Sequence, residues 1–138
     1  MATNTEPVEI DRNEWAVILD HEMWRTVELR WLPGAMTDDA FKATLELLAA
    51  AGERVHPRFM IIDATEFHHD FGDGVMEWRD ENIIPRYGAA GVTKFVFLVP
   101  DGAPGTMESG GAPRVEGRAT FPTAWFSTRD HAYRWLAE

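Results

Sequence analysis

The chain has 138 residues, of which 13 are Lys or Arg and 23 are Asp or Glu, and its formal net charge at pH 7 is −10. Such an acidic surface repels phosphate groups, so the charge argues against nucleic acid and anionic membranes as partners. The chain has no cysteine, which excludes disulfides and thiolate metal sites. It also has no apolar run long enough to span a bilayer, so we expect a cytoplasmic protein without membrane insertion.

The start of the chain differs in composition from the rest. Residues 1–12 are polar and acidic, without the basic and apolar regions of a signal peptide, and we expect them to form a loose leader. Residues 13–138 have the length of one domain. Within this domain, residues 14–20 (EWAVILD) predict a first strand.

Residues 23–31 predict a second strand. Apolar residues there alternate with polar ones such as Thr26, Glu28 and Arg30. A period of two is typical of a strand with one face in the core and the other in water. A helix follows over roughly residues 38–51, where Thr37 is a good N-cap and apolar residues recur at helical spacing.

The middle of the chain predicts a strand, a loop and a second helix. Residues 58–63 (RFMIID) carry an uninterrupted apolar run, which is typical of a strand covered on both faces. Asp73 is placed to cap a helix after the loop. Pro85 disfavours helical geometry at Ile84, so this helix is expected to end or kink there.

The last part of the chain predicts two strands, a long loop and a closing helix. Residues 94–99 (KFVFLV) form a second continuous apolar run, and residues 119–126 a weaker strand. Between them, residues 101–118 are rich in Gly and Pro, and we expect a flexible loop that is either a lid or disordered. Residues 127–130 (STRD) match a capping box that would open the closing helix.

These elements follow one another in the order β-β-α-β-α-β-β-α. Strands joined through helices are parallel with right-handed crossovers. We therefore predict an α/β fold: a single-domain mixed, mostly parallel β-sheet of about five strands with packed helices. The runs over 58–63 and 94–99 should lie side by side at its centre.

The loop after the central strand holds the candidate functional residues. Ligands of such sheets gather where the carboxyl ends of strands meet helix starts. Asp63 ends the strand and could act as an acid or base, or simply cap the turn by accepting backbone N–H groups. His68 and His69 could act as acid, base or ligand, but neighbouring residues on an extended loop point in different directions.

No catalytic or cofactor motif is complete in the chain. The sequence has no H-E-x-x-H zinc motif, no G-x-S-x-G motif and no P-loop, so we predict neither a metal nor a cofactor. The binding candidates are the loop and helix residues around the histidines: Thr65, His68, His69, Asp70, Phe71 and Trp78.

Four segments resemble the anti-sigma-factor-antagonist (STAS) superfamily, especially its stand-alone bacterial members with an N-terminal hairpin. They are MIID over 60–63, HHDFGDG over 68–74, KFVFLV over 94–99 and FSTRDHAYRWLAE over 126–138. What the resemblance implies is the fold, together with binding of proteins or small apolar ligands.

The regulatory switch of that family is not carried over. In its regulatory members, a Ser or Thr at the start of the helix after the central strand is phosphorylated. Here Phe71 follows Asp70, and Thr65 is the only Ser or Thr between Arg58 and Gly91. The loop over 101–118 also stands where the family has another helix.

Two functions are compatible with this pattern. The first is a non-catalytic regulatory or binding module that recognises a protein partner or small ligand through the 65–80 loop-helix surface. The second is a small enzyme or ligand carrier that uses Asp63, His68, His69 and Asp70 at the carboxyl end of the sheet. Tryptophans 24 and 78 could anchor a partner or a homodimer in either case.

Overall fold

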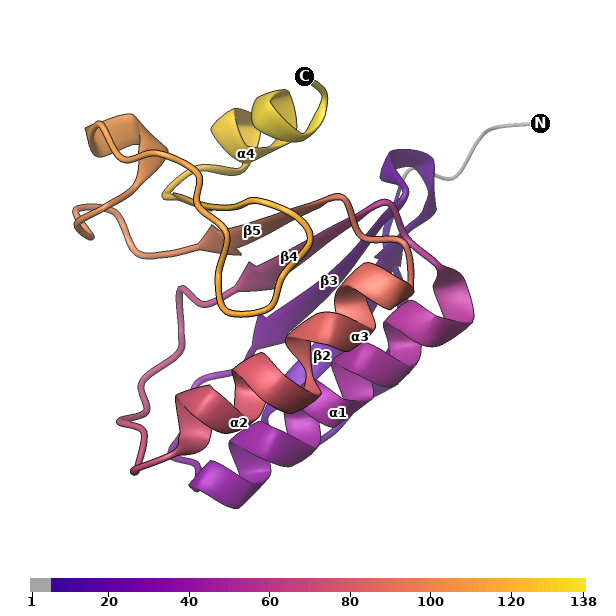
Figure 1. The fold of residues 1–138 in the computed structure, drawn as a ribbon, viewed down its shortest axis with the longest axis vertical. Helices are drawn as coiled ribbons and strands as arrows, with labels where there is room; N and C mark the ends of the chain where they lie inside the picture. Colours follow the sequence, from indigo (N-terminus) through magenta and orange to yellow (C-terminus); the bar gives the residue numbers. More distant parts are fainter. Residues whose placement is uncertain (1–5) are drawn as a thin grey trace.

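A six-stranded mixed β-sheet organises the chain in the computed structural model, which describes residues 6–138 (Figure 1). The strands lie in the same order in the sheet as in the sequence. The first three pair antiparallel, and the last four pair parallel. The strands are β1 (Val8–Arg12), β2 (Ala16–His21), β3 (Thr26–Trp31), β4 (Phe59–Asp63), β5 (Lys94–Leu98) and β6 (Thr123–Phe126).

Helices cover both faces of the sheet. Three of them lie together on one face, and the last lies on the opposite face (Figure 1). The helices are α1 (Asp38–Val55), α2 (Val75–Asn82), α3 (Ile84–Ala89) and α4 (Arg129–Leu136). We call the two sides of the sheet the α1–α3 face and the α4 face. The predicted α/β class with a mostly parallel sheet is confirmed. Among residues 6–138, no helix combines the length and the hydropathy that crossing a bilayer requires.

Strands β4 and β5 form the dry centre of the sheet. They pair in parallel, with Ile61 opposite Val96 and Ile62 opposite Phe97. Ile61 and Val96 belong to the core under α4, whereas Ile62 packs in the core under α1–α3. The side-by-side arrangement predicted from the two apolar runs is therefore confirmed, and both faces of β4 are buried.

The strand count and the leader differ from the prediction. Strand β1 forms within the segment expected to be a loose leader and pairs antiparallel with β2, so the sheet has six strands instead of about five. Residues 1–5 lie outside the described part of the chain. A lone edge strand is hard to predict here, because the alternation in VEIDR is short and mostly polar.

The polar side of β3, the second of the predicted strands, is buried. Thr26 and Glu28 are buried on the α4 face, against the expectation that this side of β3 faces water. The alternation itself is correct, but α4 brings Arg129 over this face, and its guanidinium pairs with the buried carboxylate. A polar residue on a strand can thus be buried when an ionic partner reaches it.

Two helix boundaries have causes that the sequence only partly indicated. The helix expected from Asp73 to Ile84 divides into α2 and α3 at Ile83, and Pro85 occupies the first turn of α3. Helix α4 lacks the predicted capping box: its N-cap is Thr128, without a side-chain cap. The carboxylate of Glu108 instead accepts the backbone N–H groups of Ser127 and Thr128, each at 3.1 Å.

The dry centre predicts a large stability difference between a core and a surface truncation. Ile61→Ala should lower the free energy of unfolding by about 3 kcal/mol, because it leaves a cavity between β4 and α4. Val115→Ala, at an exposed position, should change it by less than about 0.5 kcal/mol. Urea denaturation followed by circular dichroism measures both. Equal small effects would contradict the buried placement of β4.

Candidate functional site

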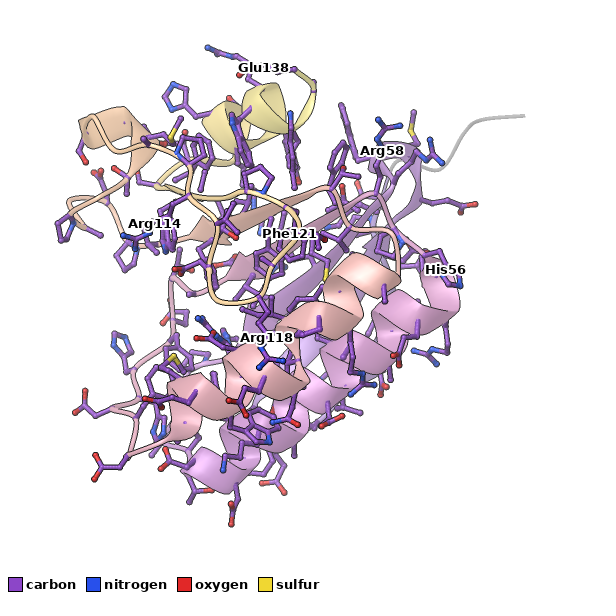
Figure 2. All side chains as sticks on the ribbon, viewed as in Figure 1. His56, Arg58, Arg114, Arg118, Phe121 and Glu138 are labelled. Atoms are coloured by element: carbon purple, nitrogen blue, oxygen red, sulfur yellow. The ribbon has the colours of Figure 1, made fainter. Side chains whose placement is uncertain are left out.

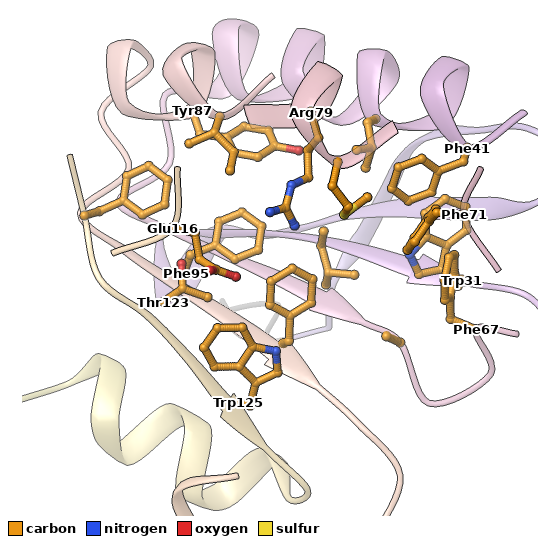
Figure 3. A pocket seen from close by; sticks show the side chains of 17 residues that line it. Trp31, Phe41, Phe67, Phe71, Arg79, Tyr87, Phe95, Glu116, Thr123 and Trp125 are labelled. Atoms are coloured by element: carbon orange, nitrogen blue, oxygen red, sulfur yellow. The ribbon is translucent and has the colours of Figure 1, made fainter. Parts of the chain in front are cut away.

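A cavity of about 240 Å³ lies between the α1–α3 face of the sheet and the helices that cover it (Figure 3). It lies over strands β3 to β6 and reaches from the carboxyl ends of β3 and β4 to Phe95 and Thr123, near the amino ends of β5 and β6. Side chains that alternate along four strands form its floor. These are Trp31, Ile62, Phe95, Phe97, Thr123 and Trp125.

Helices and loops form the walls of the cavity. The helical side chains are Phe41, Leu45, Met76, Arg79, Ile84 and Tyr87. The loop side chains come from the segments after β4 and before β6, and they are Ala64, Phe67, Phe71, Glu116 and Phe121. Nine of the 17 lining residues are aromatic, so the cavity favours flat apolar groups. Phe71, Phe97 and Trp125 are partly exposed, and they mark where it opens to solvent.

The loop before β6 closes one side of the cavity. It leaves the sheet at Arg114 and passes in front of β5 toward α2 and α3 (Figures 1 and 2). Close packing holds it there: a Cβ atom on Gly88 of α3 would lie 2.6 Å from Thr120 Oγ1, and one on Gly117 would lie 2.8 Å from Asp80 Cγ. Two acidic residues of the predicted 101–118 loop have structural roles. Glu116 lines the cavity, and Glu108 caps the start of α4.

An aromatic cluster forms the wall at the other end. The rings of Phe67 and Trp31 are 4.9 Å apart, and those of Phe41 and Phe71 are 4.6 Å apart. His69 packs edge-on against Phe71, with ring centroids separated by 5.4 Å. The loop after β4 thus turns its phenylalanines inward onto β3 and α1.

The histidines of this loop do not converge on one another or on Asp63. The Nε2 atom of His69 is hydrogen-bonded to Asp38 Oδ1 at the start of α1, at 2.7 Å. His68 and Asp70 are exposed and make no hydrogen bond or ion pair within the described residues. Neither His68 nor His69 lines the cavity. His69 therefore fastens the loop to α1, and the predicted candidates Asp63, His68 and Asp70 are not its partners.

Asp63 belongs to the opposite face of the sheet. Its Oδ1 atom accepts hydrogen bonds from the backbone N–H and the hydroxyl of Thr65, at 3.1 and 2.7 Å. Its Oδ2 atom accepts a bond of 2.9 Å from Arg129. The turn-capping interpretation of Asp63 is confirmed, and Thr65 is the residue that it caps.

A buried ionic network surrounds Glu28 on the α4 face. Arg129 binds the Glu28 carboxylate through two hydrogen bonds of 2.9 and 2.7 Å, and His21 Nε2 lies 2.8 Å from Oε1. Arg30, the third partner, donates a hydrogen bond of 3.2 Å to Oε2. Burial by itself raises the pKa of Glu28, but the hydrogen bonds from His21 and Arg129 and the nearby positive charges outweigh it and lower the pKa to about 2.

The remaining candidates divide between core and surface. Phe71, one of the predicted binding residues, lines the cavity. Trp78 is half-buried beside the core, with Lys42 Nζ 5.4 Å from its ring centre. Trp24 is 51% exposed and stacks on Tyr133 of α4 at 5.5 Å. Of these two tryptophans, Trp24 offers the larger exposed surface.

Several lining residues were missed at the level of sequence. Arg79 and Tyr87 reach the cavity from α2 and α3, and no motif distinguishes them from ordinary helix residues. Phe95 and Phe97 carried a usable signal, since they share one face of a strand predicted to be central. Within residues 6–138, no group of three or more His, Asp or Glu side chains is arranged to hold a metal ion.

Comparison of the chain with protein-family models, with curated proteins and with solved structures finds no match. The STAS-like assignment therefore stays a proposal that rests on the sequence pattern and the order of the elements.

The low pKa of Glu28 predicts a pH-dependent contribution to stability. The Glu28 carboxyl group binds its proton more tightly in the unfolded chain than in the folded protein. The stability that it contributes is therefore fully present above pH 4.5 and is lost as the pH falls toward 2. Glu28→Gln should lower the free energy of unfolding by about 3 kcal/mol at pH 7, since it removes the buried carboxylate that pairs with the Arg129 guanidinium. This difference from the wild type should shrink between pH 4.5 and 2.5.

Urea denaturation at a series of pH values measures the difference. Glu77→Gln serves as the control, because Glu77 is exposed and makes no ion pair among the described residues. A Glu28→Gln difference that stays constant with pH would show that the carboxylate is not held by its cationic partners.

Proposed function

We propose that this chain is a non-catalytic binding module of the STAS-like type, and that it binds a small apolar molecule in the cavity on the α1–α3 face. The observation that carries the proposal is the aromatic lining of a 240 Å³ space over strands β3 to β6. Ligand sites in folds of this class are concave, mostly apolar and supplied with a few polar groups.

The size of the cavity suggests the size of its ligand. An engineered cavity of about 150 Å³ in another protein holds one benzene ring. The larger space here suits a molecule of about two rings or a short branched chain. A ligand of that size would contact Phe67, Phe71 and Met76, all within the 65–80 segment that the sequence indicated as a recognition surface.

Ligand binding would therefore bear on the outer surface of the same segment. The loop that carries Phe67 and Phe71 inward carries His68 and Asp70 outward. In this proposal, the protein acts in the cytoplasm, and a protein partner or a second copy of the chain binds the loop in the conformation that the ligand stabilises. This links the binding and regulatory roles through one short segment of backbone.

The alternative of an enzyme built on Asp63, His68, His69 and Asp70 has less support. Asp63 is committed to Thr65 and Arg129 on the other face, and His69 is committed to Asp38. A general base needs to stand within hydrogen-bond reach of its substrate. The cavity walls offer none of these four side chains to a bound molecule.

Filling the cavity should abolish binding of a neutral apolar probe. We expect naphthalene to bind saturably to the wild type, as measured by saturation-transfer NMR. Ala64→Phe places a ring in the cavity and should remove this binding. Ala43→Phe, on the exposed side of α1, is the matched control and should bind as the wild type does. No saturable binding, or equal binding by both variants, would overturn the proposal.

Replacing the two histidines separates binding from the alternative function. His68→Ala should change the free energy of unfolding by less than about 0.5 kcal/mol and leave naphthalene binding unchanged, because the side chain is exposed and unpaired among residues 6–138. His69→Ala should destabilise the protein more, since it loses Asp38 and the ring contact to Phe71. Loss of probe binding in His68→Ala would instead favour the histidine-based site.

A further inference from the structure

The hydroxyl of Tyr87 is an unusual group in the wall of the cavity. Tyr87 is 3% exposed, and its hydroxyl has no hydrogen-bond partner within residues 6–138. A buried polar group without a partner is costly, and native proteins rarely keep one without a reason. Tyr87 lines the cavity, and Figure 3 shows its hydroxyl pointing toward the side chain of Arg79.

The guanidinium of Arg79 extends from α2 into the same space (Figure 3). Its Nε and Nη2 atoms donate to Asp80 Oδ1, at 3.2 and 2.9 Å. Its Nη1 atom donates to no residue in the described part of the chain. The cavity therefore has one cationic donor with free capacity and one neutral donor beside it.

Arg79 and Tyr87 differ in charge, but both are hydrogen-bond donors. Burial raises the pKa of Tyr87, which keeps the phenol protonated and able to donate. Arginine stays protonated at all relevant pH values and donates only. Two neighbouring donors, one of them positively charged, are complementary to an anionic oxygen pair.

We propose that the ligand of this cavity carries a carboxylate, which binds the Arg79 guanidinium and the Tyr87 hydroxyl while its apolar part lies against the aromatic floor. This inference rests on the proposed function and names the chemical class of its ligand. The ligand that we propose is an aromatic or branched aliphatic monocarboxylate.

Nearby acidic groups explain why a single negative charge is favoured. Glu116 lines the cavity from the loop side and is partly exposed. Its Oε2 atom lies 3.9 Å from Nε of Arg114, its ion-pair partner. Asp80 already neutralises part of the charge on Arg79. A phosphate or dicarboxylate would bring a second negative charge close to both residues, whereas a monocarboxylate brings only the charge that Arg79 can balance.

The test compares two probes that differ only in the anionic group. Isothermal titration calorimetry with 2-naphthylacetate and with its neutral amide, 2-naphthylacetamide, is performed at pH 7.5. The wild type should bind the carboxylate at least about tenfold more tightly than the amide, as expected for charge-assisted hydrogen bonds. Equal affinities, or tighter binding of the amide, would overturn the carboxylate assignment.

Two variants locate the anionic group. Arg79→Met should reduce the affinity for 2-naphthylacetate roughly tenfold to hundredfold and change that for the amide little. Tyr87→Phe should weaken carboxylate binding severalfold, while its resistance to urea stays equal or rises, because the variant removes an unpaired buried hydroxyl. Arg54→Met, exposed at the end of α1, is the control for loss of a positive charge.

The outcomes separate this inference from the proposed function. If naphthalene binds and the preference for the carboxylate is absent, the cavity is a binding site and the carboxylate assignment is wrong. If the preference exists but persists in both Arg79→Met and Tyr87→Phe, the anion binds elsewhere and the assignment is again wrong. If no probe binds saturably, both the proposed function and this inference fail.

Discussion

The constraint that shapes this molecule is the width of its sheet. Six strands at a spacing of about 4.8 Å span roughly 24 Å, whereas one helix covers about 10 Å. On one face, α1 lies over β1 to β3, and α2 and α3 pack beside it. On the other, α4 lies mainly over β5 and β6 and also packs on Ile61 of β4. Within residues 6–138, each face therefore keeps a strip that no helix covers, at opposite edges of the sheet.

The two strips are closed by different chemistry. On the α4 face, Glu28 occupies the middle of a strand, and Arg129 reaches back from the start of α4 to bind it. Both oxygens of this carboxylate are hydrogen-bonded, so the ion pair stabilises the packing of α4 on the sheet. On the α1–α3 face, the loop before β6 arches over Phe97 and Trp125 without filling the space beneath. There Arg79 and Tyr87 line the cavity, and the Tyr87 hydroxyl is buried without a partner among residues 6–138.

Much of the fold was predictable because local signals agree with the final contacts. The apolar runs FMIID and KFVFL specify buried neighbouring strands, and Thr37 caps α1 as predicted, by accepting the N–H of Ala40. The cavity was not predictable, because it depends on how far α3 and a loop distant in sequence leave β5 uncovered. The adjacent histidines lie on the loop that carries Phe67 and Phe71 into the cavity wall, but His69 binds Asp38 and neither histidine lines the cavity.

The most direct test uses the tryptophans as reporters of where an apolar carboxylate binds. Trp31 and Trp125 line the cavity, whereas Trp24 and Trp135 belong to the region around α4. Indole N–H signals, assigned with single Trp→Phe variants, are followed by ¹H–¹⁵N NMR during titration with 2-naphthylacetate. We expect saturable shifts of the Trp31 and Trp125 signals, with the Trp24 and Trp135 signals unchanged. Shifts centred on Trp24 and Trp135, or none at all, would contradict it.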